Sequence, residues 1–277
     1  MGSSDIAPSH APQWLVPVST LLLGSGVFFW GVAYVLMTRR SIQTRSYGMP
    51  LLGLVINVSW EIVYGFYVAE MLFEKLGFVL WLILDMGLIY TTVRFAPEEW
   101  ASTNKLVGRH MASIIVLMLG IGCWGHYAFA SWWLSRPGIG IGDKSGKWYY
   151  GQDGYDTTEL AYWSAGVSQL VLSSASVAML IIRGHSGGTG YTIWFCRMIG
   201  SISGLGFCSA LLWWYWPEAH SYFIHPMSIF IGGLSLICDL VYPLVLWHVR
   251  QTETVMADGR LVGAHMLENE KKKEKGQ

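Results

Sequence analysis

Leu-Leu-Gly-Leu-Val-Ile-Asn-Val-Ser-Trp-Glu-Ile-Val-Tyr, at residues 51–64, is the stretch that decides the fold. It is apolar enough to cross a bilayer, yet it carries the carboxyl group of Glu61. A second such stretch contains Asp239, followed like Glu61 by an aliphatic pair and a tyrosine. An ionisable group at mid-membrane depth is costly and by default marks a functional site. Glu61 and Asp239 therefore suggest proton chemistry or ion handling inside a membrane protein.

The composition places the whole chain in the membrane class. Of its 277 residues, 53% are hydrophobic and only 13% are charged, whereas an ordinary soluble domain carries about 25% charged residues. A helix needs about 20 apolar residues to span about 30 Å of hydrocarbon. Seven such runs predict an all-α membrane protein, a bundle of seven transmembrane helices in one domain. The runs lie near residues 14–37, 49–72, 76–95, 111–134, 160–182, 191–215 and 226–248.

The placement of basic residues predicts the orientation. Lys and Arg gather after the first, third and fifth spans and in the tail, and basic loops stay cytosolic. We therefore expect a lumenal N-terminal segment at 1–13, a transmembrane domain at 14–250 with a lumenal loop at 135–160, and a charged cytosolic tail at 251–277. Lys273 and Lys275 resemble a dilysine-type retrieval signal, which predicts the endoplasmic reticulum. A plain solvated tail explains them equally well.

Depth arithmetic brings three carboxyl groups to one level. At 1.5 Å per residue, Glu61 lies roughly 18 Å, and Asp85 and Asp239 roughly 15 Å, from the predicted cytosolic ends of their spans. A buried carboxyl can be a hydrogen-bonded helix contact. Alternatively, apolar surroundings can keep it protonated, so that it serves as a general acid. Both readings stay open for all three residues.

Other polar side chains enter the spans at different depths. His126 lies somewhat deeper toward the predicted lumenal side, and Gln169 lies in the lumenal half of its span. Arg197 lies about 9 Å from the cytosolic side by the helical rise. It either snorkels to the interface or pairs with a carboxylate or phosphate.

Aromatic residues surround the level of the carboxyl groups. Trp60, Tyr64, Trp81 and Tyr242 lie too deep for an interfacial belt. Their ring faces can stabilise a cation, by about 2 kcal/mol or more when desolvated. Tyr64 and Tyr242 each follow a carboxyl residue by three positions, so they either orient the acid or pack in the core.

The loop at 135–160 is long and rich in glycine, which suggests a lid over an opening. Within it, Asp156-Thr-Thr-Glu159 has capping-box spacing directly before a span, and we favour this interpretation over a metal or diphosphate site. The chain lacks the Asp-rich magnesium motifs of ionisation-type terpene synthases, His-Glu-x-x-His and Gly-x-Ser-x-Gly. Metal-dependent and serine-hydrolase chemistry therefore lose support.

Several motifs carry a specific resemblance. They are Tyr47-Gly-Met49, Asn57-Val-Ser-Trp60-Glu61 with Val63-Tyr64, Gly125-His126, Gln169, Trp194 with Arg197, Trp214-Tyr-Trp-Pro-Glu-Ala219, and Asp239 with Tyr242. From about residue 14 to residue 250, the chain resembles the fungal transmembrane terpene cyclases of meroterpenoid and indole-diterpene biosynthesis, the paxilline and pyripyropene type.

The resemblance implies an enzyme and a class of substrate. It assigns essential carboxyl roles to Glu61 and Asp239. The implied enzyme is a class II-type cyclase with isomerase-like or lyase-like chemistry, started by protonation and needing no metal or other cofactor. The implied partner is a lipophilic prenylated molecule, with or without a terminal epoxide, in the bilayer, and no nucleic acid. Residues expected to contact the substrate or its cation are Asn57, Trp60, Tyr64, Trp81, Asp85, His126, Gln169, Arg197 and Tyr242.

Our hypothesis is that Glu61 donates the proton. Asp239 would then orient Glu61 or share its proton, because two nearby carboxyl groups titrate as a pair. Two alternatives come from other classes: a proton-coupled small-molecule transporter, whose midplane carboxyls bind protons, and a seven-helix receptor without enzymatic activity.

Overall fold

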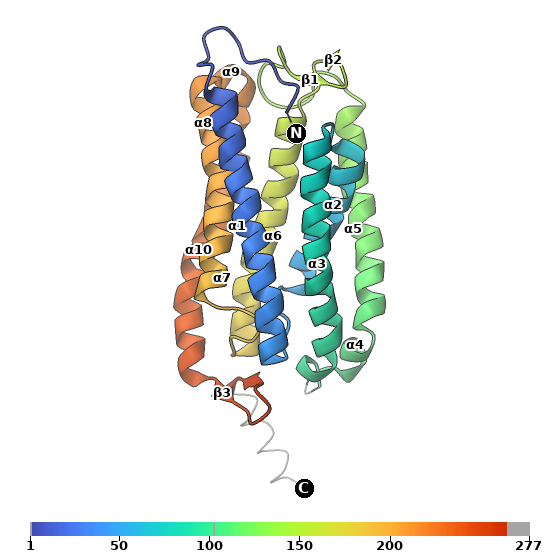
Figure 1. Cartoon of the computed structure of the whole chain (residues 1–277), viewed down its shortest axis with the longest axis vertical. Coiled ribbons are helices and arrows are strands. Elements are labelled where there is room, and N and C mark those ends of the chain that lie inside the picture. The colour runs from blue at the N-terminus through green and yellow to red at the C-terminus, as the bar shows by residue number, and fades with distance from the viewer. Residues whose placement is uncertain (1, 102, 265–277) are drawn as a thin grey trace.

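The described part of the chain forms a bundle of seven helical spans, as the sequence predicts (Figure 1). The structure, a computed structural model, describes residues 2–101 and 103–264. Each span is long and apolar enough to cross a membrane. The spans are α1 (Leu15–Thr44), α2 (Leu51–Val63) with the π-helical η1 (Tyr64–Val68), α3 (Leu72–Glu99), α5 (Met111–Leu134), α6 (Thr157–Arg183), α7 (Tyr191–Ser201) continued by the π-helical η2 (Ile202–Phe207) and by α8 (Cys208–Tyr215), and α10 (Pro226–Thr252).

Short elements connect the spans at the two ends of the bundle. The connecting helices are α4 (Lys105–Arg109), α9 (Pro217–His220) and the 3₁₀ turn η3 (Ser221–Ile224). Strand β1 (Trp148–Tyr149) pairs antiparallel with β2 (Gln152–Asp153), and β3 (Thr254–Val255) with β4 (Leu261–Val262). The β1–β2 hairpin, α9 and the N-terminal segment share one end, while β3 lies at the other (Figure 1). The dilysine motif lies outside the described residues.

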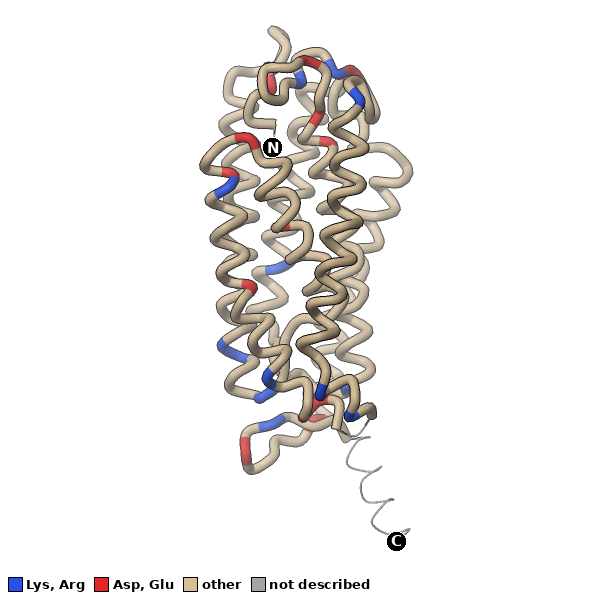
Figure 2. The backbone as a smooth tube through the Cα atoms, turned by 90° about the vertical axis from the view of Figure 1, so that its right-hand side faces the viewer, with Lys and Arg blue, Asp and Glu red and all other residues tan. Residues whose placement is uncertain are grey.

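The exterior of the bundle matches a hydrocarbon environment. Large apolar side chains such as Val116, Trp124 and Ile182 are at least 70% exposed, and a soluble protein rarely exposes so much contiguous apolar surface. Lys, Arg, Asp and Glu gather toward the two ends, with few along the middle (Figure 2). The protein is therefore an integral membrane protein.

Helix ends differ from the predicted spans where polar residues continue a helix. The first span ends at Thr44 rather than at residue 37. The next residue, Arg45, adopts a left-handed backbone conformation with φ 49°. Apolar length sets how much of a helix lies in hydrocarbon, but backbone hydrogen bonding continues through the interface. The second span is shorter than predicted and ends at Val68 rather than at residue 72.

The packing order brings five spans around one core. Helix α6 packs against α2 and α10, α1 packs against α3 and α7, and α5 packs against α2. The approach of α1 to the sixth span depends on glycine, because a Cβ on Gly26 would lie only 2.8 Å from the Cα of Gly204. The central core joins α1, α2, α3, α6 and α7 through Tyr34, Met37, Leu54, Val58, Leu88, Leu172 and Ile193.

Candidate active site

Asn57 brings two of the predicted carboxyl groups together. It lies one helical turn before Glu61 on α2, and its Nδ2 is 2.8 Å from Glu61 Oε1 and 3.2 Å from Asp85 Oδ2 on α3. The carboxyl groups of Glu61 and Asp85 also interact with each other, and both residues are fully buried. Two adjacent, buried carboxylates cannot both be ionised at low cost. At least one of the two therefore carries a proton.

Tyr34 on α1 completes this first cluster. Asn57 Nδ2 donates to Tyr34 Oη at 2.6 Å, and the Tyr34 hydroxyl donates to Glu61 Oε1 at 3.4 Å. Sequence reasoning missed Tyr34 because the predicted first span ended at residue 37, which put Tyr34 near the interface. Since α1 continues to Thr44, Tyr34 lies about 15 Å from that end at 1.5 Å per residue. The available signal was its spacing of four residues from Trp30 on one helical face.

Asp239 belongs to a second cluster and is not paired with Glu61. Gln169 Nε2 lies 3.4 Å from Asp239 Oδ2, and Arg197 Nη2 lies 4.0 Å from Asp239 Oδ1. The Trp194 indole donates to the backbone carbonyl of Asp239 at 2.6 Å. Arg197 is only 4% exposed, so it pairs with a carboxylate and does not snorkel to the interface. The level of the two acids was foreseen, but their partners differ from the expected pair.

A chain of hydrogen bonds extends the second cluster toward α1. Gln169 accepts a hydrogen bond from Ser201 at 2.9 Å, and Ser201 in turn accepts one from the Trp30 indole at 3.2 Å. The amide of Gln169 also donates to Ser173 at 2.9 Å. Because each of these hydrogen bonds constrains the direction of its donor, the side chains of Gln169 and Ser201 are held in one orientation.

A cavity of about 130 Å³ lies between the two clusters. The first cluster contributes Tyr34 and Asn57 to its wall, and the second contributes Gln169 and Ser201. The carboxyl residues Glu61, Asp85 and Asp239 lie behind this wall, since none of them is among the lining residues. The full lining is Leu23, Gly26, Val27, Trp30, Tyr34, Asn57, Trp60, Trp81, Ala165, Ser168, Gln169, Leu172, Gly200, Ser201, Gly204 and Leu205.

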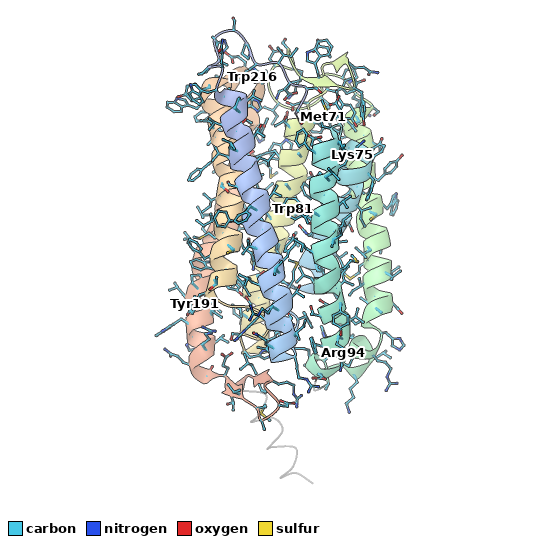
Figure 3. All side chains as sticks on the ribbon, in the orientation of Figure 1. Met71, Lys75, Trp81, Arg94, Tyr191 and Trp216 are labelled. Atoms are coloured by element: carbon cyan, nitrogen blue, oxygen red, sulfur yellow. The ribbon has the colours of Figure 1, made fainter. Side chains whose placement is uncertain are left out.

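Indole rings form much of the remaining wall. Trp81 lies at mid-height between α1 and α3 (Figure 3), with its ring 6.2 Å from that of Trp60. The Trp60 indole N–H donates to Ser164 at 2.9 Å, and that of Trp81 donates to the Val27 carbonyl at 3.3 Å. These bonds fix the rings, so that the cavity is lined by aromatic surface suited to a cation.

The remaining candidate residues, Tyr64, His126 and Tyr242, lie behind the residues that line the cavity. Tyr64 stacks on Trp60 with ring centroids 5.3 Å apart. His126 Nε2 lies 3.2 Å from the Ile56 carbonyl, and the Tyr242 hydroxyl bonds Thr189 at 2.6 Å. Both tyrosines are buried, and the guanidinium carbon of Arg197 lies 5.7 Å from the ring centroid of Tyr242. Of the two interpretations of the tyrosines, the structure therefore shows packing, of Tyr64 against Trp60 and of Tyr242 against Arg197. Across residues 2–101 and 103–264, no three His, Cys, Asp or Glu side chains are grouped to hold a metal ion.

The loop at 135–160 takes part in a cap over one end of the bundle, which we define as residues 2–14, 135–156 and 216–225. The fully buried Lys147 lies 2.7 Å from Asp5, 3.7 Å from Asp156 and 3.2 Å from His220. Its ammonium group also lies 4.5 Å from the ring centroid of Trp216, which is labelled in the cap in Figure 3. One buried cation thus ties together three distant parts of the chain.

Electrostatics in the cap follow from this cation. Burial would raise the pKa of Asp156, but Lys147 and Lys144 hold it below its usual range. Burial, followed by the charge of Lys147, lowers the pKa of His220 to about 2. Asp156 also caps α6 by accepting from the Glu159 amide at 2.9 Å, as predicted. The Glu159 side chain binds Lys144 and the Ile141 amide, so the reciprocal half of the capping box was wrong.

Comparisons with known proteins identify the family. The family model of the Pyr4-like transmembrane terpene cyclases matches residues 4–252. Terpene cyclase ascF of Acremonium egyptiacum is 36% identical, over 93% of this chain and 91% of that protein. Terpene cyclase ptmB of Penicillium ochrochloron is 35% identical, over 88% of this chain and 92% of that protein. No solved structure matches the chain. The chain therefore belongs to the Pyr4-like transmembrane terpene cyclases, the fungal family whose motifs its sequence carries.

Proposed function

We propose that this membrane terpene cyclase starts its reaction by protonation, and that Glu61 is the source of the proton. The observation that carries the proposal is the environment of Glu61. It is fully buried, its hydrogen bonds run to the neutral side chains of Asn57 and Tyr34, and it shares its site with a second acid. A carboxyl group in such a setting holds its proton and can serve as a general acid.

The proposed substrate is a lipophilic prenylated molecule, with or without a terminal epoxide. Protonation of an epoxide oxygen breaks one C–O bond and leaves a hydroxyl group and a carbocation. Protonation of an alkene carbon instead forms a C–H bond and leaves the cation on the neighbouring carbon. A further alkene of the chain attacks the cation and forms a C–C bond. A base finally removes a proton and forms a C=C bond, so that the product is an isomer of the substrate.

The aromatic wall supports the middle of this sequence. Trp60 and Trp81 present fixed ring faces to the cavity, and ring faces stabilise developing positive charge in a desolvated site. On the other side, we propose that Asp239 remains a carboxylate beside Arg197 and orients Gln169. This replaces direct proton sharing between Asp239 and Glu61.

The test uses membranes that contain the protein and a series of candidate prenyl aromatics with and without a terminal epoxide. A product of unchanged mass and new ring structure, identified by NMR, is the expected result. Glu61→Gln and Asp239→Asn should each abolish the product while preserving folding. The matched control is Asp153→Asn on the exposed strand β2, which should leave the rate unchanged. Near-normal product from Glu61→Gln would overturn Glu61 as the proton source.

We also propose that the cap faces the lumen of the endoplasmic reticulum and that the end carrying β3 and β4 faces the cytosol. Basic residues in the loops support this orientation. An Asn-x-Thr acceptor inserted beside Gly151 in the β1–β2 hairpin should be glycosylated in cells, while one inserted beside Gly259 should not. The reverse pattern would overturn the orientation.

A further inference from the structure

The wall of the cavity separates the proposed proton source from the cavity itself, which is the proposed substrate site. Glu61 and Asp85 are fully buried, and the members of their cluster that line the cavity are Tyr34 and Asn57. The hydrogen bonds that connect Glu61 to the cavity wall therefore run through one of these two side chains.

The chemistry of the two side chains decides which one can carry it. An amide such as Asn57 donates hydrogen bonds but does not release its protons readily. A phenol hydroxyl both accepts and donates, and the Tyr34 hydroxyl lies 3.4 Å from Glu61 Oε1. That separation is long for a hydrogen bond, yet catalytic hydrogen bonds in ligand-free structures are often long and tighten when substrate is bound.

Asn57 is placed to assist the phenol. Its Nδ2 lies 2.6 Å from Tyr34 Oη, 2.8 Å from Glu61 Oε1 and 3.2 Å from Asp85 Oδ2. The amide has only two N–H bonds, so it cannot give each of these three oxygens a hydrogen of its own. At least one further hydrogen in the cluster therefore comes from the phenol or from a protonated carboxyl group. An N–H directed at Tyr34 Oη stabilises negative charge that develops there when the phenol gives up its proton.

Packing holds the phenol in this position. Tyr34 is 2% exposed and belongs to the central core. Its ring lies edge-on to that of Trp30, with centroids 5.7 Å apart, and the Trp30 indole is itself fixed by Ser201. Packing therefore holds the phenol ring beside Glu61 and in the cavity wall, while the O–H bond can still rotate about the C–O bond.

We infer that Tyr34 delivers the proton to the substrate and that Glu61 restores it. In the ligand-free structure the Tyr34 hydroxyl donates to Glu61 Oε1, so the relay first requires this hydroxyl to turn toward the substrate and to accept a hydrogen bond from protonated Glu61. In one concerted step the O–H bond of Tyr34 then breaks as its proton bonds to the substrate. The O–H bond of Glu61 breaks as its proton moves to Tyr34 Oη. The phenol is regenerated, the carboxylate remains on Glu61, and the positive charge is on the substrate. This inference rests on the proposed function, since it requires Glu61 as the source.

The first experiment compares Tyr34→Phe with Tyr222→Phe in membranes that show cyclase activity. Tyr222 is a matched control because it is also fully buried and its hydroxyl bonds a side chain, His220 at 2.8 Å, in the cap rather than in the cluster of Glu61 and Asp85. Tyr34→Phe should lower kcat by a factor on the order of 10² to 10⁴ and leave KM and thermal unfolding close to wild type. Tyr222→Phe should keep wild-type kcat.

A second experiment removes the risk that the phenylalanine variant fails to fold. Fluorotyrosines placed at position 34 by codon suppression keep the hydroxyl and the ring but make the phenol a stronger acid. A phenol that delivers the proton should give a kcat that rises with its acidity, whereas a structural hydroxyl gives a constant kcat. Wild-type kcat in Tyr34→Phe, or a kcat insensitive to fluorination, would overturn the relay and leave Glu61 as donor. An active Glu61→Gln would instead overturn the proposed function.

Discussion

Asp85 is the residue whose role the structure sharpens most. It shares the amide of Asn57 with the proposed proton source and interacts with Glu61 directly. In Asp85→Asn the new side chain can still accept from Asn57, so the cluster should fold. Its amide can also donate to Glu61, however, which favours the ionised form of that carboxyl group, so that a smaller fraction of Glu61 holds the proton that it must donate.

We therefore expect Asp85→Asn to lower kcat about tenfold, or about 1.4 kcal/mol in the activation barrier. The loss should be smaller than that of Glu61→Gln, and thermal unfolding in detergent should confirm that both variants fold. Equal losses would mean that the two acids act as one indivisible unit. An unchanged kcat in Asp85→Asn would mean that Asp85 does not influence the proton donor.

Depth along a helix could be predicted from the sequence, but rotation about the helix axis could not. The rise per residue placed Glu61, Asp85 and Asp239 at one level, and the structure keeps them in the middle of their spans. Which acid meets which depends on how α2, α3 and α10 turn toward one another, and this is decided by packing across the whole bundle. Asp85 therefore proved to be the neighbour of Glu61, and Asp239 that of Arg197.

At the level of single elements, two spans in the described part of the chain contain π-helical segments. Segment η1 begins at Tyr64, three residues after Glu61, and η2 carries the lining residues Gly204 and Leu205. A π-helical turn contains extra residues, so it shifts the phase of the helical face, and such turns are frequent at functional sites. Tyr64 was expected to lie beside Glu61, three residues earlier, but its ring stacks on Trp60, four residues earlier; both spacings give neighbours on one face of a helix.

The close contact between α1 and η2 provides a test of this geometry. In Gly26→Ala the new Cβ would lie 2.8 Å from Gly204 Cα and 2.9 Å from the Gly200 carbonyl, so the two spans must move apart. Overpacking of this kind costs about 1 to 3 kcal/mol. We expect a lower Tm in detergent and less cyclised product, because Gly26, Gly200 and Gly204 line the cavity.

Gly24→Ala is the matched control on the same helix, since its Cβ would meet nothing within 4 Å. Its free energy of unfolding should change by no more than about 0.5 kcal/mol, as for an ordinary surface substitution, so its Tm should stay close to that of the wild type. Equal Tm values for the two alanine variants would contradict the view that glycine is required for the approach of α1 to η2.

At the scale of the whole molecule, the cap joins residues that are far apart in the sequence. Lys147 contacts Asp5 across 142 positions and His220 across 73. The sequence supported a lid and a helix cap at Asp156, because these signals are local. It could not indicate that the N-terminal segment and α9 meet the loop around one buried cation, since such contacts leave no local pattern.

This arrangement makes the stability of the cap dependent on pH. Burial and Lys147 lower the pKa of His220 to about 2, while an unfolded histidine titrates near about 6.5. Below about pH 6.5 the unfolded chain binds a proton that the folded cap refuses, so stability is full above that pH and falls as the pH drops. The lowered pKa of Asp156 has the same sign but acts further into acid.

We therefore expect the Tm of the detergent-solubilised protein to fall by a few degrees between pH 7.5 and pH 5.5. In His220→Asn this decrease should be smaller, because the variant removes the histidine whose protonation the folded state opposes. His10→Asn, at an exposed histidine of the same cap, should keep the full decrease. If His220→Asn and wild type lose the same number of degrees, the acid sensitivity comes from groups other than the buried contact between His220 and Lys147.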